Sequence, residues 1–312
     1  MGKRPRSGVA ADLRTAHASA RGTKMAAHLL ALTADGGVPL FTRSIGDLKT
    51  LPFTQIGTLN AIHLYSRLRG GELQTAVTIG SKILWRVFHN SIILIIATSE
   101  DATSDSHLFH LLDNIFAAMV MMVGMDSLQN IRNVDHLKRE LRICFFLVDH
   151  LLQQLDQDMA TVSDLTGTVD CLLCTESPTL QNYLTTFVNL ANTAYGCLMV
   201  RGKVAVATKK WWSLTGQEMA LLSAFVNTYP KTTSREVSIY LPNSCPMVCN
   251  RLVTLQLTQG VEVCVLCGPV PSLNQLEEDH NHEARATEVY IWLWYFRSGG
   301  AAYNSSVLYR IN

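Results

Sequence analysis

The sequence has little charge and no excess of either sign. Charged residues make up 16% of the 312 positions, and 26 basic against 25 acidic side chains leave a formal net charge of +1. Proteins that bind the phosphate backbone need a clustered basic excess, and here only residues 1–24 show one. Nucleic acid is therefore not an expected partner. Hydrophobic residues reach 48%, which excludes a disordered chain and supplies apolar surface for ordered cores.

Motifs of the common nucleotide-binding and hydrolytic sites are also missing. The chain contains no G-x-x-x-x-G-K, G-x-G-x-x-G, G-x-S-x-G or H-E-x-x-H pattern. No run reaches the roughly 18 apolar residues that a membrane span requires. The longest runs, Ile92–Ala97 and Ile115–Val123, suit a buried strand and a core helix. We therefore expect no catalytic residues, cofactor, metal or transmembrane segment, while a peripheral membrane contact stays open.

Cysteines are the strongest chemical signal in the chain. Cys171 and Cys174 form one C-x-x-C pair, Cys264 and Cys267 form another, and Cys245 and Cys249 add two thiols. A structural zinc site needs four ligands that converge on one point. However, Val265 and Leu266 continue a strand pattern, in which residues three apart point to opposite faces. We predict reduced, buried cysteines without stoichiometric zinc, and a zinc-binding or redox protein remains the alternative.

Hydrophobic periodicity predicts a first set of elements from Met25 onward. Asp35-Gly36-Gly37 indicates a hairpin turn, because glycine tolerates a positive φ, and Asn133 can cap a helix. The predicted elements are strands at Ala27–Thr33 and Val38–Arg43, a helix at Pro52–Arg69, strands at Leu73–Gly80, Ile83–His89 and Ile92–Thr98, and two long helices over Leu108–Val123 and Val134–Leu155.

The same order then recurs without sequence identity. The second set comprises strands at Cys197–Val200 and Val204–Thr208, a helix at Ser213–Tyr229, and strands at Val237–Leu241, Leu252–Leu257 and Val261–Leu266, with an additional helix at Thr179–Ala194 before it. The repetition predicts an α+β protein of tandem domains. Each domain is expected to hold a five-stranded antiparallel sheet with helices on both faces.

Changes in composition set the expected domain boundaries. We predict a disordered leader at 1–24, a first domain at 25–160, a linker at 161–178, a second domain at 179–276 and an atypical tail at 277–312. The second domain is expected to be incomplete, because no apolar pattern for closing helices follows Val261–Leu266.

The helix predicted at Pro52–Arg69 carries apolar side chains in every direction. A helix that is apolar all round must be covered all round, and its own sheet can cover one side. The opposite side then needs either another element of this chain or a partner, and we predict a protein interface. The expected interface residues are Leu59, Ile62, His63, Tyr65 and Ser66 of the helix with Leu73 and Val77 of the next strand.

Several spaced segments between Met25 and Leu276 resemble the Fuzzy family of planar cell polarity proteins. They are Gly37-Val38-Pro39-Leu40-Phe41-x-Arg43-Ser44, Leu51-Pro52-Phe53-x-x-Ile56-Gly57-x-Leu59-Asn60-x-x-His63, Asn130-Ile131-Arg132-Asn133-Val134-x-x-Leu137-Lys138, Trp211-Trp212-x-Leu214, Tyr240-Leu241-Pro242 and Cys264-x-Leu266-Cys267-Gly268-Pro269. The resemblance implies longin-type domains, each with a five-stranded antiparallel sheet and flanking helices. The chain departs from the family in showing two such patterns instead of three, so a shortened form is expected.

The resemblance also implies partners and a cellular role. It implies a subunit of the ciliogenesis and planar polarity effector complex, with Inturned and the WD-repeat protein Fritz as partners. It further implies contact with Rab and Rab-like small GTPases, for which the Fuzzy–Inturned pair looks like a nucleotide exchange platform without a catalytic acid or base. The expected locations are the cytoplasm, the cytoskeleton and the basal body of the cilium. A vesicle-trafficking longin adaptor is a further alternative.

Overall fold

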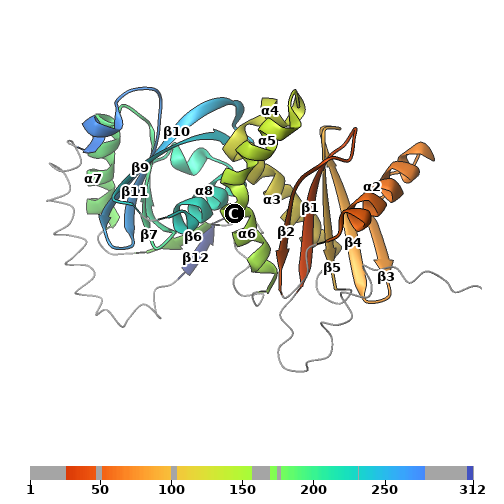
Figure 1. Ribbon diagram of the computed structural model, residues 1–312. Helices are drawn as coiled ribbons and strands as arrows, with labels where there is room; N and C mark the ends of the chain where they lie inside the picture. The colour runs from red at the N-terminus through yellow and green to blue at the C-terminus, as the bar shows by residue number, and fades with distance from the viewer. Residues whose placement is uncertain are drawn as a thin grey trace, which may run out of the picture. The chain divides into compact units, whose positions relative to one another are not determined.

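A computed structural model describes residues 26–46, 51–99, 104–156, 169–173, 177–230 and 232–277, together with the backbone of 308–311. The chain divides into two compact units, 1–165 and 166–312. Each unit contains its own β-sheet (Figure 1). The division falls within the predicted linker.

The first sheet has five antiparallel strands in the order β2-β1-β5-β4-β3. The strands are β1 (Ala27–Thr33), β2 (Pro39–Ile45), β3 (Thr75–Thr78), β4 (Ser81–Phe88) and β5 (Ile92–Thr98). Every residue of β5 is buried, because the strand lies at the centre of the sheet and both of its faces are covered. Its non-alternating apolar sequence predicted this position.

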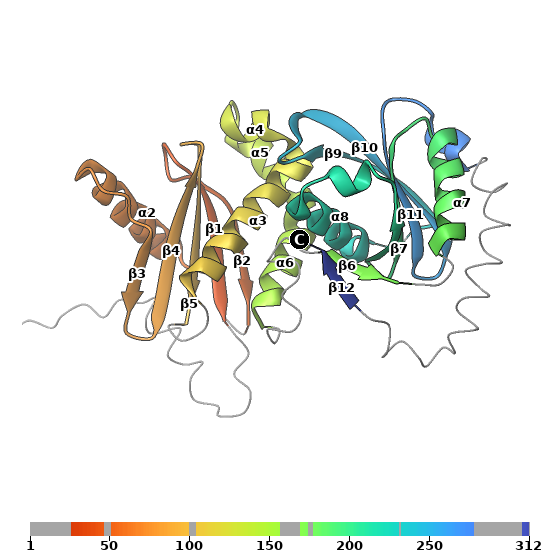
Figure 2. The same ribbon diagram turned by 180° about the vertical axis from the view of Figure 1, so that it is seen from behind.

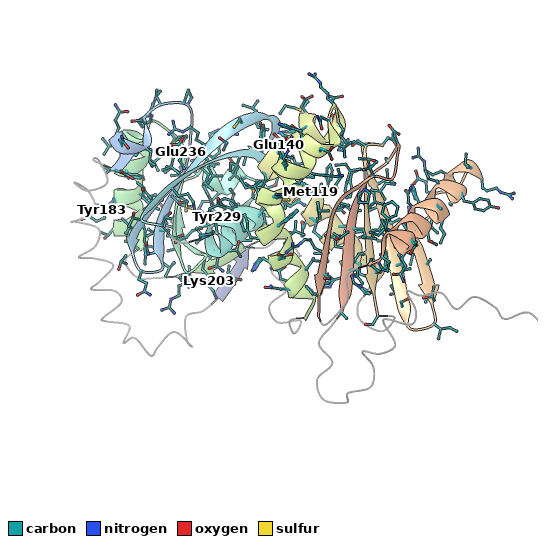
Figure 3. All side chains as sticks on the ribbon, in the orientation of Figure 1. Met119, Glu140, Tyr183, Lys203, Tyr229 and Glu236 are labelled. Carbon is teal, nitrogen blue, oxygen red and sulfur yellow. The ribbon has the colours of Figure 1, made fainter. Side chains whose placement is uncertain are left out.

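Helices cover both faces of the first sheet. Helix α2 (Phe53–Leu68) packs on one face, and α3 (Asp105–Val123) and α6 (Phe145–Gln153) pack on the other (Figures 1 and 2). By length and composition α3 could span a membrane, but its residues from Ile115 to Val123 are all buried. Met119 of α3 is fully buried (Figure 3), so α3 is a core helix of this unit.

The single long helix predicted from Val134 onward is wrong. The chain forms α5 (Val134–Glu140), a 3₁₀ turn (Leu141–Cys144), α6 and a second 3₁₀ turn (Gln154–Asp156), with the short α4 (Met125–Gln129) before them. Successive short helices keep the same three-to-four-residue apolar spacing, so periodicity did not reveal the breaks. The predicted cap is confirmed, because the Asn133 side chain accepts hydrogen bonds from the backbone N–H groups of Asp135 and His136, both at 3.0 Å.

The second sheet repeats the first and extends it. Its order is β12-β6-β8-β7-β11-β10-β9. The five strands that match the first sheet are β7 (Tyr195–Val200), β8 (Lys203–Ala207), β9 (Ser234–Leu241), β10 (Cys245–Thr258) and β11 (Val261–Cys267). The predicted antiparallel five-stranded sheet is thus present, and two strands were missed.

The two missed strands are β6 (Val169–Leu172), inside the predicted linker, and β12 (Leu308–Ile311), inside the predicted tail. Strand β6 is parallel to β8, and β12 pairs antiparallel with β6. Each of the two strands has four residues, too few for an alternating pattern to stand out.

Helices α7 (Ser177–Leu190) and α8 (Gly216–Thr228) lie on opposite faces of the second sheet (Figures 1 and 2). Leu184 and Val188 of α7 belong to the same buried cluster as Val265 of β11. Gly196 permits this close approach, because a Cβ atom there would lie 2.3 Å from Cγ2 of Val188. Helix α8 is buried at every position from Glu218 to Val226.

Candidate functional site

The inner side of α2 is fixed to the first sheet. Ile56 and Leu59 are buried in one cluster with Leu30 and Trp85. The Trp85 indole N–H on β4 donates a hydrogen bond of 3.3 Å to the Leu59 carbonyl oxygen. The orientation of the helix about its axis is therefore fixed, and the side opposite Ile56, Leu59 and His63 faces outward.

The outer side of α2 and the neighbouring edge of the sheet carry exposed apolar side chains. We call this the α2–β3 surface; its exposed members are Phe53 (76% exposed), Ile62 (45%), Tyr65 (59%), Leu68 (87%), Val77 (57%) and Ile79 (78%). Among the strands that the structure describes, β3 is the outermost of its sheet and pairs with β4 alone. Val77 pairs with Lys82 of β4, whose ammonium group contacts Asp105 of α3, so Val77 points to the face of the sheet opposite α2. Exposed apolar side chains such as those of α2 often mark an interaction site.

The structure divides the predicted interface residues into two sets. Leu59 and His63 are buried against the sheet, at 3% and 1% exposed, so these two cannot contribute surface contacts as predicted. The reason is that the sheet covers the side of α2 that carries Ile56, Leu59 and His63.

The remaining predicted residues are exposed or partly buried. Ile62, Tyr65 and Val77 are exposed, whereas Ser66 and Leu73 are partly buried. The Arg69 guanidinium donates to the Tyr65 hydroxyl at 2.8 Å and lies over its ring, and the Ser66 hydroxyl donates to the Gly71 carbonyl at 3.3 Å. A role for these residues in a protein interface stays a prediction.

His63 is a buried polar group, and among the described residues neither of its ring nitrogens has a hydrogen-bond partner. Burial lowers the pKa of His63, and the nearby Arg67 lowers it further while Glu72 opposes this shift. The fold therefore favours the neutral imidazole beneath α2, since protonation would place an uncompensated charge in the apolar layer.

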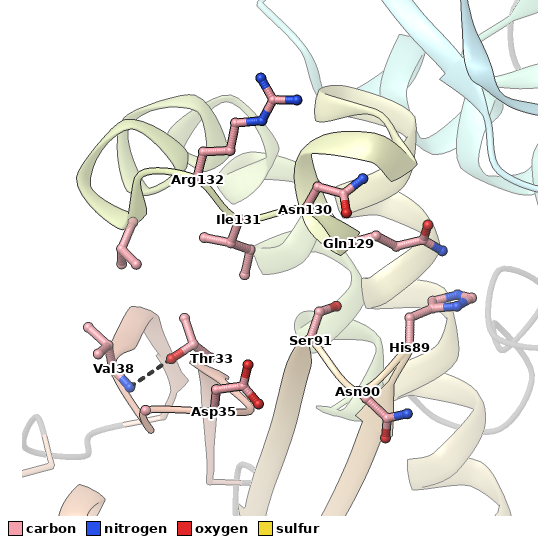
Figure 4. A pocket seen from close by; sticks show the side chains of 12 residues that line it. Thr33, Asp35, Val38, His89, Asn90, Ser91, Gln129, Asn130, Ile131 and Arg132 are labelled. Atoms are coloured by element: carbon pink, nitrogen blue, oxygen red, sulfur yellow. Dashed lines mark hydrogen bonds between the residues drawn. The ribbon is translucent and has the colours of Figure 1, made fainter.

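A polar hollow of about 850 Å³ opens at one end of the first unit (Figure 4). Asp35 comes from the β1–β2 turn, His89 and Asn90 come from the β4–β5 turn, and Asn130 and Arg132 come from the connection between α4 and α5. Gly36, Val38, Ile131 and Val134 also line it, so segments that carry the family resemblance meet here although about 90 residues separate them in sequence.

The chemistry available in this hollow is that of hydrogen bonding. Three amide side chains, two hydroxyls, the His89 imidazole, one carboxylate and one guanidinium line it, which suits polar recognition of a partner. Among the residues that the structure describes, no three His, Cys, Asp or Glu side chains gather as a possible metal site.

The cysteines of β11 follow the strand geometry predicted for them, whereas the predicted burial is wrong for Cys245 and Cys249, which are exposed near the tip of the β9–β10 hairpin. Cys267 faces the α7 side of the second sheet with Val265 and Val263. Cys264 lies directly opposite Cys197 of β7, and burial raises the pKa of the Cys197 thiol well above its ordinary value. Cys264 and Cys267 thus point to opposite faces of one strand. Cys171 is buried in β6, while Cys174 lies outside the described residues.

One buried carboxylate went unrecognised in the sequence. Glu218 of α8 accepts hydrogen bonds from the backbone N–H groups of Thr215, Asn243 and Ser244, at 3.0, 2.9 and 2.7 Å, and from the Ser244 hydroxyl at 2.8 Å. Burial raises the pKa of Glu218, but the hydrogen bonds from these donors together lower it by more, so the net shift of the pKa is downward. The Thr-x-x-Glu spacing of a capping box was the available signal.

Comparisons with known proteins identify both units. Residues 27–151 match the family model described as the first longin domain of FUZ, MON1 and HPS1, and residues 191–282 match the second longin domain of the same proteins. The chain is similar to the protein fuzzy homologs of Xenopus tropicalis (44% identical over 80% of this chain), Mus musculus (41% over 80%) and Homo sapiens (41% over 82%). It spans 59%, 60% and 61% of the length of these relatives, respectively.

Proposed function

Since this chain belongs to the Fuzzy family of longin-domain proteins, we propose that it is a non-catalytic planar cell polarity and ciliogenesis protein. In this proposal it pairs with Inturned, and the pair forms an exchange platform for a Rab or Rab-like GTPase at the ciliary base. Fritz is the proposed further partner. The proposed locations are the cytoplasm, the cytoskeleton and the basal body.

The exposed α2–β3 surface is the observation that supports pairing with a second protein. Its members Phe53, Ile62, Tyr65 and Leu68 project from a helix whose opposite side is held in the core, so a partner can bind without unfolding the domain. Burying one such side chain contributes about 1.5–3 kcal/mol. We place the contact with Inturned on Ile62 and Tyr65 of this surface.

The test replaces Ile62 with aspartate in the full chain. Ile62 is 45% exposed, so Ile62→Asp should retain the fold while its affinity for Inturned falls about tenfold or more, because a charge replaces a buried apolar contact. Affinity is measured by titration with purified Inturned, and folding by the thermal transition of the free chain. Release of labelled GDP from a Rab-type GTPase should slow in parallel.

Leu190→Asp is the matched control. Leu190 ends α7 in the second unit and is 46% exposed, so this variant introduces the same charge at a similarly exposed apolar site elsewhere. Unchanged Inturned affinity in Ile62→Asp would contradict the placement of the interface. Absence of any binding by the unaltered chain would contradict the proposed pairing itself.

A further inference from the structure

The second sheet carries two strands beyond the five that match the first sheet. Strand β6 lies beside β8, and β12 pairs with the outer edge of β6 (Figures 1 and 2). This pairing is antiparallel and runs through all four residues of each strand, from Leu308 opposite Leu172 to Ile311 opposite Val169. The outer edge of β6 therefore presents its backbone N–H and C=O groups in a geometry that accepts an extended segment.

Contacts other than those with β12 hold β6 in place. Leu172 lies in one buried cluster with Leu180 of α7. Cys171, the preceding residue, points to the opposite face of the sheet, on which α8 contacts β6. Asp170 forms an ion pair with Lys203 of β8, with 3.6 Å between the carboxylate oxygen and the ammonium nitrogen. The outer edge of β6 is therefore a fixed feature of the second unit.

Strand β12 is held mainly by its pairing with β6. Among the elements that the structure describes, β6 is the one with which β12 has most of its contacts. An isolated pairing of two short strands is only marginally stable in water. A segment that a bound partner holds beside β6 has a high effective concentration at this edge, so it can take the place of β12.

The register shows which chemistry this edge accepts. Arg310 lies opposite Asp170, and the aromatic Tyr309 and the aliphatic Ile311 come directly before and after it. Residues directly opposite each other in an antiparallel pair share one face of the sheet, and opposite charges at such positions stabilise the pairing. A basic residue at this position of an added strand therefore complements the carboxylate of Asp170.

We propose that the outer edge of β6 is a strand-accepting site for an extended segment of a partner protein. The segment pairs antiparallel with β6 and places a basic residue, flanked by apolar ones, opposite Asp170. Main-chain hydrogen bonds supply the affinity, and the residue opposite Asp170 selects for positive charge. Such a segment replaces Leu308–Ile311, so the strand β12 of this chain competes with the partner.

The test titrates a fluorescein-labelled peptide with the sequence of residues 306–312 against the full chain. Leu308→Pro/Tyr309→Pro opens the edge, because adjacent residues of a strand point their N–H groups to opposite sides and proline at both positions removes the donor that faces β6. Fluorescence anisotropy should show that this variant binds the peptide at least about tenfold more tightly than the parent, whose own strand competes. Circular dichroism checks that the variant is folded.

A second peptide that carries Arg310→Glu is the matched probe for charge. It should bind the opened chain several-fold more weakly than the first peptide, because it places a carboxylate opposite Asp170. Adding Asp170→Arg to the Leu308→Pro/Tyr309→Pro chain should reverse this preference. Amide hydrogen exchange of residues 169–172 should slow when the peptide binds, which locates the peptide on β6.

Four outcomes would overturn the proposal. One is equal affinity of the parent and the opened chain for the first peptide, and another is equal affinity of the opened chain for the two peptides. The third is binding that leaves hydrogen exchange of residues 169–172 unchanged. The fourth is a parent chain that sediments as a dimer and is dissociated by the peptide, because the occupant of the edge would then be the strand of a second copy.

Discussion

At the scale of single residues, Gly37 couples the β1–β2 turn to helix α2. It has a φ of +60°, and a Cβ atom there would lie 1.9 Å from Nδ2 of Asn60. Gly37→Ala therefore meets both a left-handed backbone conformation, which costs an L-residue about 1–2 kcal/mol, and a clash. We expect a loss of at least this amount in the free energy of unfolding, measured by denaturant titration.

Gly36→Ala provides the matched comparison, because its added Cβ would lie 3.4 Å from the nearest side-chain atom and no positive φ is required. The free energy of unfolding of this variant should stay within about 0.5 kcal/mol of that of the parent. Equal losses in both variants would show that neither the backbone conformation nor Asn60 is responsible.

His63 makes the stability of the first domain depend on pH. Its pKa is lowered in the folded chain by burial and by Arg67, whereas the unfolded chain titrates at about 6.5. The contribution of the neutral His63 to stability is therefore fully present above the pKa of the unfolded chain. It falls as the pH drops below that value, because the unfolded state then binds more protons than the folded state. His63→Leu should flatten this decline in thermal melts between about pH 7 and pH 5.

His107 contributes to the pH dependence of stability with the same sign, because burial lowers its pKa as well. His107→Leu should remove a separate part of the slope. If His63→Leu retained the full pH dependence of the parent, the neutral His63 would not be its source.

At the scale of elements, Glu218 joins helix α8 to a hairpin that lies 25 and 26 residues further along the chain. A hydrogen bond to a charged group contributes about 1.5–3 kcal/mol. In Glu218→Gln the amide nitrogen faces N–H donors, so one or two such bonds are lost. We predict a decrease of roughly 2–5 kcal/mol in the free energy of unfolding at neutral pH.

The pH provides a second check on the same contact. The pKa of Glu218 is lowered in the fold, so its contribution is present above the unfolded value and disappears as the pH falls through the folded one. The difference between parent and Glu218→Gln should therefore shrink in acid. Glu236→Gln, which breaks the partly exposed ion pair with Arg251, should cost less, about 1 kcal/mol or below. Equal losses of unfolding free energy in Glu218→Gln and Glu236→Gln would contradict the role of Glu218 as an anchor between α8 and the hairpin.

At the scale of the whole molecule, each sheet is built entirely from strands of its own unit. All five strands of the first sheet lie between Ala27 and Thr98, and helices of the same unit cover both faces. A fragment of residues 26–156 should therefore unfold in one cooperative transition when expressed alone. The measurement is its thermal unfolding by circular dichroism. A broad, non-cooperative melt would show that this unit needs residues beyond 156.

The order of the elements was readable from the sequence because it depends on local properties. The ranges of β1 and β5 were predicted to the residue, and Asn133 was recognised as a cap. Periodicity and turn chemistry act over a few residues, so the repeated pattern of the two longin domains could be predicted before any tertiary contact was known.

What the sequence could not decide depends on contacts between distant segments. A helical projection of α2 shows apolar residues on all sides, but only the packed sheet determines that Leu59 and His63 face inward while Ile62 faces solvent. The strand β6 is too short to recognise until its neighbours β8 and β12 are in place. Likewise, the anchor at Glu218 and the position of Arg310 opposite Asp170 arise from pairing across strands, because register is a property of two segments and not of either one alone.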